Sequence, residues 1–185
     1  VWRPKNYDSK HEGYVLLRHA PARSINTVSI KVAVDVTPAA IVAVAHKLGI
    51  QGELPAENSI ALGAGEVTPL EMTNAIASLG AGGIFAKPKF VEAFNGKTTP
   101  PAVGERVMDE KVAYLVTDMM RTVVTSGTAN RASKLKIPIA GKTGPPWRGP
   151  AIEPPDLTDS ITASMARSTT VLPAVLPVTS MACMI

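Results

Sequence analysis

Residues 137–144 read Ile-Pro-Ile-Ala-Gly-Lys-Thr-Gly, a short apolar run followed by a lysine, a threonine and two glycines. The apolar run over 137–140 predicts a short β-strand. Lys142 would present a cation beside that strand, Thr143 would add a hydroxyl, and Gly144 would let a substrate backbone approach closely. Taken alone this is a weak signal for a substrate-binding edge strand, because Lys-Thr-Gly occurs often by chance. A lysine that is merely solvated on a strand is the plainer alternative.

Spacing and cysteine content exclude three other kinds of site. A phosphate-binding loop needs a glycine five residues before Gly141, and Lys136 occupies that position. The histidines lack paired acids at metal-ligand spacing, so we expect no metal site. The single cysteine, Cys183, excludes an internal disulfide framework and a Cys-based zinc site.

A second short pattern, Ser24-Ile25-Asn26, lies far upstream, at or near the end of a predicted helix over 22–35. It places a hydroxyl and a carboxamide two residues apart. Taken alone, the pattern is common, and a serine that simply caps a helix is the more frequent explanation.

Two further helices are predicted to begin at Thr-Pro pairs. Thr37 and Thr68 can each cap a helix whose first turn holds a proline, where the missing N–H costs nothing. Glu71, three residues after Thr68, completes a capping box. The remaining expected elements are a helix over 109–126 and a short strand or hairpin over 85–94. The sequence therefore predicts a mixed α/β or α+β domain.

Composition restricts the class of protein. The 185 residues are 45% hydrophobic and 18% charged, which suffices for a folded core. The net charge of +4 is mild and spread along the chain, so we expect no nucleic-acid partner. No apolar run approaches the ~18 residues that would span a membrane. Because the sequence begins at Val1 without a signal-peptide pattern, we expect it to be an interior piece of a longer protein.

Taken together, these patterns resemble the transpeptidase domain of class A penicillin-binding proteins, the bifunctional peptidoglycan synthases of bacteria. The similar segments occur in the family's order, and they are residues 2–7, 13–18, 23–28, 46–50, 59–63, 66–72, 123–129 and 139–144. The resemblance covers roughly residues 1–144. It implies the penicillin-binding, β-lactamase-like fold, an α/β (α+β) arrangement with helices packed on an antiparallel sheet, here incomplete.

The resemblance also implies a role for each matching residue. The family uses a nucleophilic serine in Ser-x-x-Lys, then Ser-x-Asn, then Lys-Thr-Gly. The nucleophile attacks a D-Ala-D-Ala bond, forms an acyl-enzyme and passes the acyl group to an amine of a neighbouring stem peptide. By analogy, Ser24 relays a proton and Asn26 donates to a substrate amide carbonyl. Lys142 and Thr143 hold the terminal carboxylate, and Gly144 lies where the strand pairs with the substrate backbone.

Partners and location follow from the same resemblance. It implies peptidoglycan stem peptides, a lipid-linked precursor and β-lactams as ligands, with no metal or organic cofactor. The parent protein would carry a glycosyltransferase domain upstream, lie on the periplasmic face of the inner membrane, and act in cell-wall synthesis, cell shape and antibiotic resistance. The alternatives are a β-lactamase or D,D-carboxypeptidase relative and a non-catalytic penicillin-recognising module. The match over 66–72 argues against the first of these.

The chain departs from the family at the nucleophile. No Ser-x-x-Lys precedes Ser24, and we expect that motif to lie upstream of Val1. The one literal match, residues 133–136, directly precedes the predicted strand and is interpreted as a solvated basic loop. We therefore predict that the chain alone is inactive.

The second departure begins at Pro145, where the family has a threonine whose N–H forms part of the oxyanion hole. Proline has no N–H to donate. Removing one base from a codon run for Thr-Thr-Val-Glu gives Pro-Pro-Trp-Arg, which is the sequence of residues 145–148. We expect the domain to end at Gly144 and residues 145–185 to be a tail outside the family, either frameshifted or a disordered Pro/Ser/Thr-rich segment. A genuine, unrelated tail is the alternative.

Overall fold

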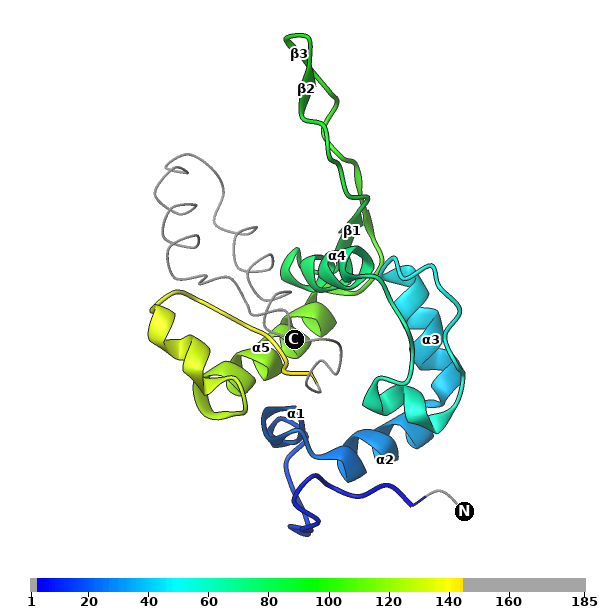
Figure 1. Ribbon diagram of the computed structural model, residues 1–185, viewed down its shortest axis with the longest axis vertical. Helices are drawn as coiled ribbons and strands as arrows, with labels where there is room; N and C mark the ends of the chain where they lie inside the picture. Colours follow the sequence, from blue (N-terminus) through cyan, green and yellow to red (C-terminus); the bar gives the residue numbers. More distant parts are fainter. Residues whose placement is uncertain (1–2, 145–185) are drawn as a thin grey trace, which may run out of the picture.

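The computed structural model describes residues 3–144, so the predictions for residues 145–185 lie outside the described part of the chain. Helices and short strands follow one another as in Figure 1. In chain order they are α1 (His19–Arg23), α2 (Asn26–Val36), α3 (Pro38–Lys47), η1 (Asn58–Leu62), α4 (Pro69–Gly80), β1 (Ile84–Ala86), β2 (Ala93–Phe94), β3 (Lys97–Thr98), β4 (Gly104–Arg106), α5 (Glu110–Ser126) and η2 (Asn130–Leu135).

The helix predicted over 22–35 is in fact two helices. α1 ends at Arg23 and α2 begins at Asn26, because Ser24 adopts a left-handed conformation with φ 56° and ψ 46°. The N–H of Ile25 donates to the carbonyl of Ala20 at 3.0 Å and closes the last turn of α1. Glycine usually occupies such a left-handed position at the end of a helix. Because serine stands here instead, no signal in the sequence marked the end of the helix.

The two Thr-Pro helix starts are confirmed. The Thr37 hydroxyl accepts from the N–H of Ala40 at 3.4 Å at the start of α3. At the start of α4, the Thr68 hydroxyl accepts from the N–H of Glu71 at 3.2 Å, and the Glu71 carboxylate accepts from the Thr68 N–H at 2.9 Å. The capping box fixes this helix start from both directions.

The capping box makes stability depend on acidity. Hydrogen bonds from the Thr68 hydroxyl, the Thr68 N–H and the Gln51 N–H lower the pKa of Glu71 from 4.5 to about 2. Because the folded-state pKa is depressed, this stabilisation is present above pH 4.5 and is lost as pH falls towards 2. We expect unfolding temperatures measured between these pH values to fall more steeply for the wild type than for Glu71→Gln. Glu53→Gln, which removes a carboxylate outside the box, should follow the wild type. Parallel profiles for the wild type and Glu71→Gln would contradict this prediction.

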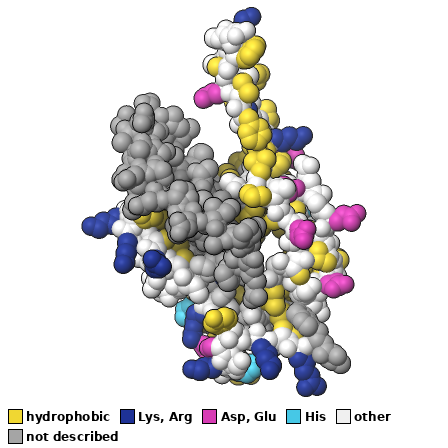
Figure 2. All heavy atoms as spheres, in the orientation of Figure 1, with side chains coloured by type: hydrophobic (Ala, Val, Ile, Leu, Met, Phe, Trp, Pro, Cys, Tyr) yellow, Lys and Arg dark blue, Asp and Glu magenta, His cyan; other side chains and the backbone are white. Residues whose placement is uncertain are grey.

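The region between α4 and α5 forms a two-stranded arm. β1 pairs with β4 and β2 pairs with β3, both antiparallel. The arm projects from the helical body, and apolar side chains follow its length (Figures 1 and 2). Phe90, Phe94 and Val103 are exposed there. The predicted strand or hairpin over 85–94 thus corresponds to β1 and β2, whose partner strands lie later in the chain.

The packing that positions the site centres on α5. Val123 and Val124 of α5 are buried, and Val124 packs in a cluster with Ala132 and Ile139. The strand predicted over 137–140 is wrong, because within residues 3–144 no neighbouring strand pairs with this segment. The segment is instead held on α5 by the buried Ile139 side chain and by the N–H of Gly141, which donates to the carbonyl of Met120 at 3.3 Å.

No single helix within residues 3–144 is long and apolar enough to cross a membrane. The pair α2 and α3, bent by 89°, meets that test together by length and composition. In the same residues, no group of three or more His, Cys, Asp or Glu side chains could hold a metal ion.

Candidate active site

The two short patterns singled out in the sequence meet in space. The Lys142 Nζ donates to the Ser24 Oγ at 2.8 Å, although the residues lie 118 positions apart. The same Nζ donates to the carbonyl of Thr143 at 2.7 Å and lies 3.4 Å from the Thr143 Oγ1. Three oxygen atoms of Ser24 and Thr143 therefore lie within hydrogen-bond distance of the ammonium group.

Ser24 is placed by the turn between α1 and α2. Ala20 and Ala22 of α1 are buried, and α1 packs against α5. An ion pair between Arg18 and Asp118 joins the approach to α1 to the middle of α5. The left-handed turn after α1 then leaves the Ser24 side chain half-buried and directed at Lys142.

Lys142 is placed by the segment that packs on α5. Gly141 is buried, and its hydrogen bond to Met120 fixes the backbone just before the lysine. Lys142 itself is half-buried, and this burial lowers the pKa of its ammonium group below 10.5. A desolvated lysine beside a hydroxyl is a frequent feature of functional sites, because burial brings it closer to giving up its proton.

Among the described residues, no carboxylate forms an ion pair with Lys142. The ion pairs among residues 3–144 are Arg18–Asp118 and Arg23–Glu12. The contacts of the Lys142 Nζ are hydroxyl and carbonyl oxygens, which carry no net charge. The site therefore keeps a positive charge that a bound anion could balance.

The other sequence-predicted residues lie at varying distances from this contact. Asn26 begins α2, and its Nδ2 donates to the carbonyl of Lys5 at 3.0 Å rather than to Ser24 or Lys142. Gly144 directly follows Thr143 and is exposed. Ser133 lies in η2, not in a loop, and its exposed hydroxyl donates to the carbonyl of Asn130 at 2.6 Å.

One residue of this group was missed from the sequence. The Thr128 Oγ1 lies 2.6 Å from the Thr143 Oγ1, and the Thr128 N–H donates to the carbonyl of Ala22 at 3.0 Å. Thr128 thus joins the Lys-Thr-Gly segment to the end of α1. In the sequence, Thr128 belongs to the segment 123–129 that resembles the family, but that resemblance assigned it no role in the site.

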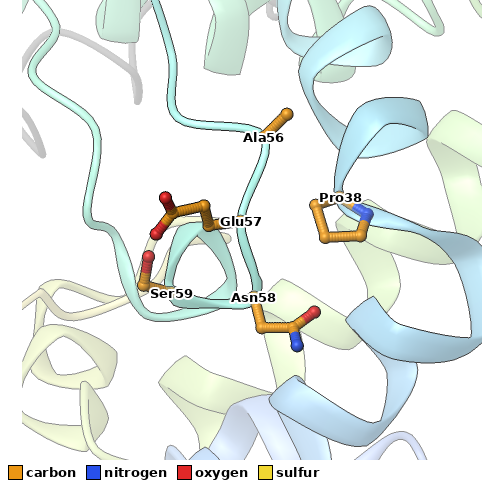
Figure 3. Close-up of a pocket in the computed structure, with 5 residues that line it drawn as sticks. All are labelled: Pro38, Ala56, Glu57, Asn58 and Ser59. Carbon is orange, nitrogen blue, oxygen red and sulfur yellow. The ribbon is translucent and has the colours of Figure 1, made fainter. Parts of the chain in front are cut away.

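The cavity drawn in Figure 3 is separate from the contact between Ser24 and Lys142. It has a volume of about 470 Å³ and is lined by Pro38, Ala56, Glu57, Asn58 and Ser59. Neither Ser24 nor Lys142 lines it. A carboxylate at its wall disfavours the anionic ligand that the Lys142 contact would accept. We therefore place the candidate site at Ser24 and Lys142.

Comparison with known proteins identifies the family. The family model described as the penicillin-binding protein transpeptidase domain matches residues 1–146. The chain belongs to this family. Penicillin-binding protein 1A of Aquifex aeolicus is 40% identical to this transpeptidase chain over 148 residues, which cover 77% of the chain and 20% of that protein. Penicillin-binding protein 1A of Neisseria cinerea is 34% identical over 156 residues, covering 78% and 20%. The chain thus spans about a fifth of the length of these relatives.

Solved structures confirm the fold. Penicillin-binding protein 1A from Haemophilus influenzae superposes on 77% of this transpeptidase chain with a TM-score of 0.68 at 22% identity, over 28% of its own chain. The PonA1 protein of Mycobacterium tuberculosis, solved with penicillin V, superposes on 65% of the chain with a TM-score of 0.56 at 24% identity, over 37% of its own chain. The α/β (α+β) penicillin-binding transpeptidase fold expected from the sequence is therefore confirmed.

Proposed function

We propose that residues 1–144 carry the proton-relay and carboxylate-binding half of a peptidoglycan D,D-transpeptidase site. The observation that carries the proposal is the 2.8 Å hydrogen bond between Lys142 and Ser24, because it joins the two family motifs into one group. Family membership supplies the reaction class, and the geometry supports a division of roles between the residues.

Ser24 can pass a proton in one direction. Its oxygen accepts from the Lys142 ammonium group, which leaves its own O–H free to donate to a reacting group. When Ser24 gives up that proton, it can be replaced from Lys142, whose lowered pKa makes the transfer easier. This is the relay needed to protonate a leaving amine.

Lys142 and Thr143 are suited to hold the terminal carboxylate of a stem peptide or a β-lactam. Within residues 3–144 the hydrogen-bond partners of the ammonium group are neutral oxygens, and the Thr143 hydroxyl is one of them. A carboxylate beside both would complete a charge-assisted hydrogen-bonded group. Asn26 would donate a hydrogen bond to the substrate amide carbonyl once its present hydrogen bond to the carbonyl of Lys5 is broken.

The nucleophile must come from another segment. Ser133 of the literal Ser-x-x-Lys is exposed and bonded to its own helical turn. We propose that a Ser-x-x-Lys segment preceding these residues in a longer protein supplies it. That protein would be a penicillin-binding peptidoglycan synthase, with its transpeptidase domain on the periplasmic side of the inner membrane.

A chimera tests the proposal. Residues 1–144 replace the corresponding segment of penicillin-binding protein 1A from Aquifex aeolicus, the 40% identical relative, so that the remainder of that protein supplies the nucleophile segment. We expect the chimera to form a stable covalent adduct with fluorescent penicillin. It should also release D-alanine and form cross-links from a stem-peptide substrate. The 185-residue chain alone should remain unlabelled.

Each rival function predicts a different result. A β-lactamase would turn penicillin over without keeping the adduct. A D,D-carboxypeptidase would release D-alanine without forming cross-links, and a non-catalytic module would bind penicillin reversibly. Any of these results for the chimera, or covalent labelling of the chain alone, would contradict the proposal.

A further inference from the structure

We infer that Thr128 is a positioning residue that aims the hydroxyl hydrogen of Thr143 at the substrate carboxylate. The inference rests on the proposed function, since it assigns the device by which that site recognises its anion. Thr128 lies outside the three family motifs. Its hydroxyl is the group that contacts the site, through the Thr143 hydroxyl.

The Thr143 hydroxyl has few hydrogen bonds to offer. A threonine hydroxyl carries one hydrogen and two lone pairs. The Lys142 Nζ, 3.4 Å away, can only donate to it, whereas the Thr128 Oγ1, 2.6 Å away, can donate or accept. If Thr143 donates to Thr128, it has no hydrogen left for a ligand. If Thr128 donates, the Thr143 hydrogen is free.

The substrate carboxylate favours one direction of these hydrogen bonds. A carboxylate has no hydrogen of its own, so it binds only where donors converge. The chain Thr128 to Thr143 to carboxylate points every hydroxyl in one direction, and hydrogen bonds aligned in this way strengthen one another. Thr128 is exposed, so water can satisfy its remaining lone pair. An anion at Lys142 therefore selects the arrangement in which Thr128 donates.

Backbone hydrogen bonds hold Thr128 firmly in place. Its N–H donates to Ala22 at 3.0 Å, and the flanking Gly127 and Ala129 N–H groups both donate to the carbonyl of Val123, at 3.0 and 3.2 Å. A Cβ added to Gly127 would lie 2.3 Å from the Ala22 oxygen, so only glycine permits this close approach. The hydroxyl is thus carried on a backbone that is fixed to both α1 and α5.

The test compares an acid with its ester in the chimera. Thr128→Val keeps the shape and removes the hydroxyl, and Thr128→Ser keeps the hydroxyl. Losing a hydrogen bond in a chain that ends on a charged group should slow acylation by benzylpenicillin roughly ten- to a hundredfold. Acylation by benzylpenicillin methyl ester, which offers no carboxylate charge, should be slowed much less by Thr128→Val. The preference for acid over ester therefore falls in Thr128→Val and returns in Thr128→Ser, while the unfolding temperature of the full 185-residue chain changes little.

Three outcomes would overturn the inference. Equal slowing of acid and ester would show a merely structural role for Thr128, and failure of Thr128→Ser to restore the preference would show that the hydroxyl is not the cause. If the wild-type chimera is acylated and the Thr128→Val chimera shows the same acylation rate and the same preference for acid over ester, this inference alone is overturned. If the wild-type chimera is not acylated, the proposed function itself falls, and this inference falls with it.

Discussion

In the chimera, Lys142→Ala is expected to slow acylation by penicillin by about 10²- to 10³-fold, the effect of removing one preorganised donor from a reacting site. The reason is geometric. The Lys142 Nζ is the atom that joins Ser24 to Thr143, and among residues 3–144 no carboxylate pairs with its charge. Stopped-flow acylation with fluorescent penicillin measures the rate. Lys134→Ala, which removes an exposed lysine of η2, is the matched control and should leave the rate unchanged.

The same lysine should determine the alkaline limit of the reaction. Burial lowers the pKa of Lys142 below 10.5, so its charged form is lost at a lower pH than for a free lysine. We expect the wild-type rate to fall on the alkaline side at a pH below 10.5. Lys142→Arg, which stays charged, should be slower at neutral pH but should lack that fall. An alkaline fall of the same shape in Lys142→Arg would contradict the assignment.

The second large effect is expected at Ser24. Ser24→Ala removes the relay hydroxyl while keeping the Cβ in its left-handed turn, and it should slow acylation by about 10²- to 10⁴-fold, the range for a positioned acid–base group. Ser29→Ala is the matched control, because the Ser29 hydroxyl donates to Ile25 within α2 and does not contact Lys142. Equal acylation rates for Ser24→Ala and the wild type would show that Ser24 takes no part in the mechanism.

Helix starts were the most predictable part of the fold. The signals at Thr37 and Thr68 are local, since each needs only a side-chain oxygen and a nearby N–H, and both are present as predicted. The break at Ser24 was not predictable in this way. A left-handed residue at a helix end is usually glycine, and here the packing of α1 against α5 holds a serine in that conformation.

Strand predictions depended on partners that the local sequence does not reveal. The run 137–140 has the composition of a strand, but its Ile139 side chain packs in the Val124 cluster, and within residues 3–144 no strand pairs with it. β1 likewise finds its partner in β4, after a second hairpin has intervened. Strand pairing is a property of the whole chain rather than of the strand.

The candidate site was predictable as a list and not as an arrangement. Ser24 and Lys142 could be selected through the family resemblance, and the structure brings them into contact. Asn26 and Gly144 were selected in the same way, and their contacts with substrate stay predictions. Thr128 was missed because its place in the site depends on one hydroxyl–hydroxyl distance of 2.6 Å, which no short motif encodes.

A double-mutant cycle on acylation of the chimera tests the central claim most directly. If Ser24 and Lys142 act as one relay through their 2.8 Å hydrogen bond, removing the second residue should cost little once the first is gone. The account predicts that Ser24→Ala/Lys142→Ala is about as slow as the slower single variant. A double variant whose loss equals the product of the two single losses would show two independent residues, and it would contradict the account.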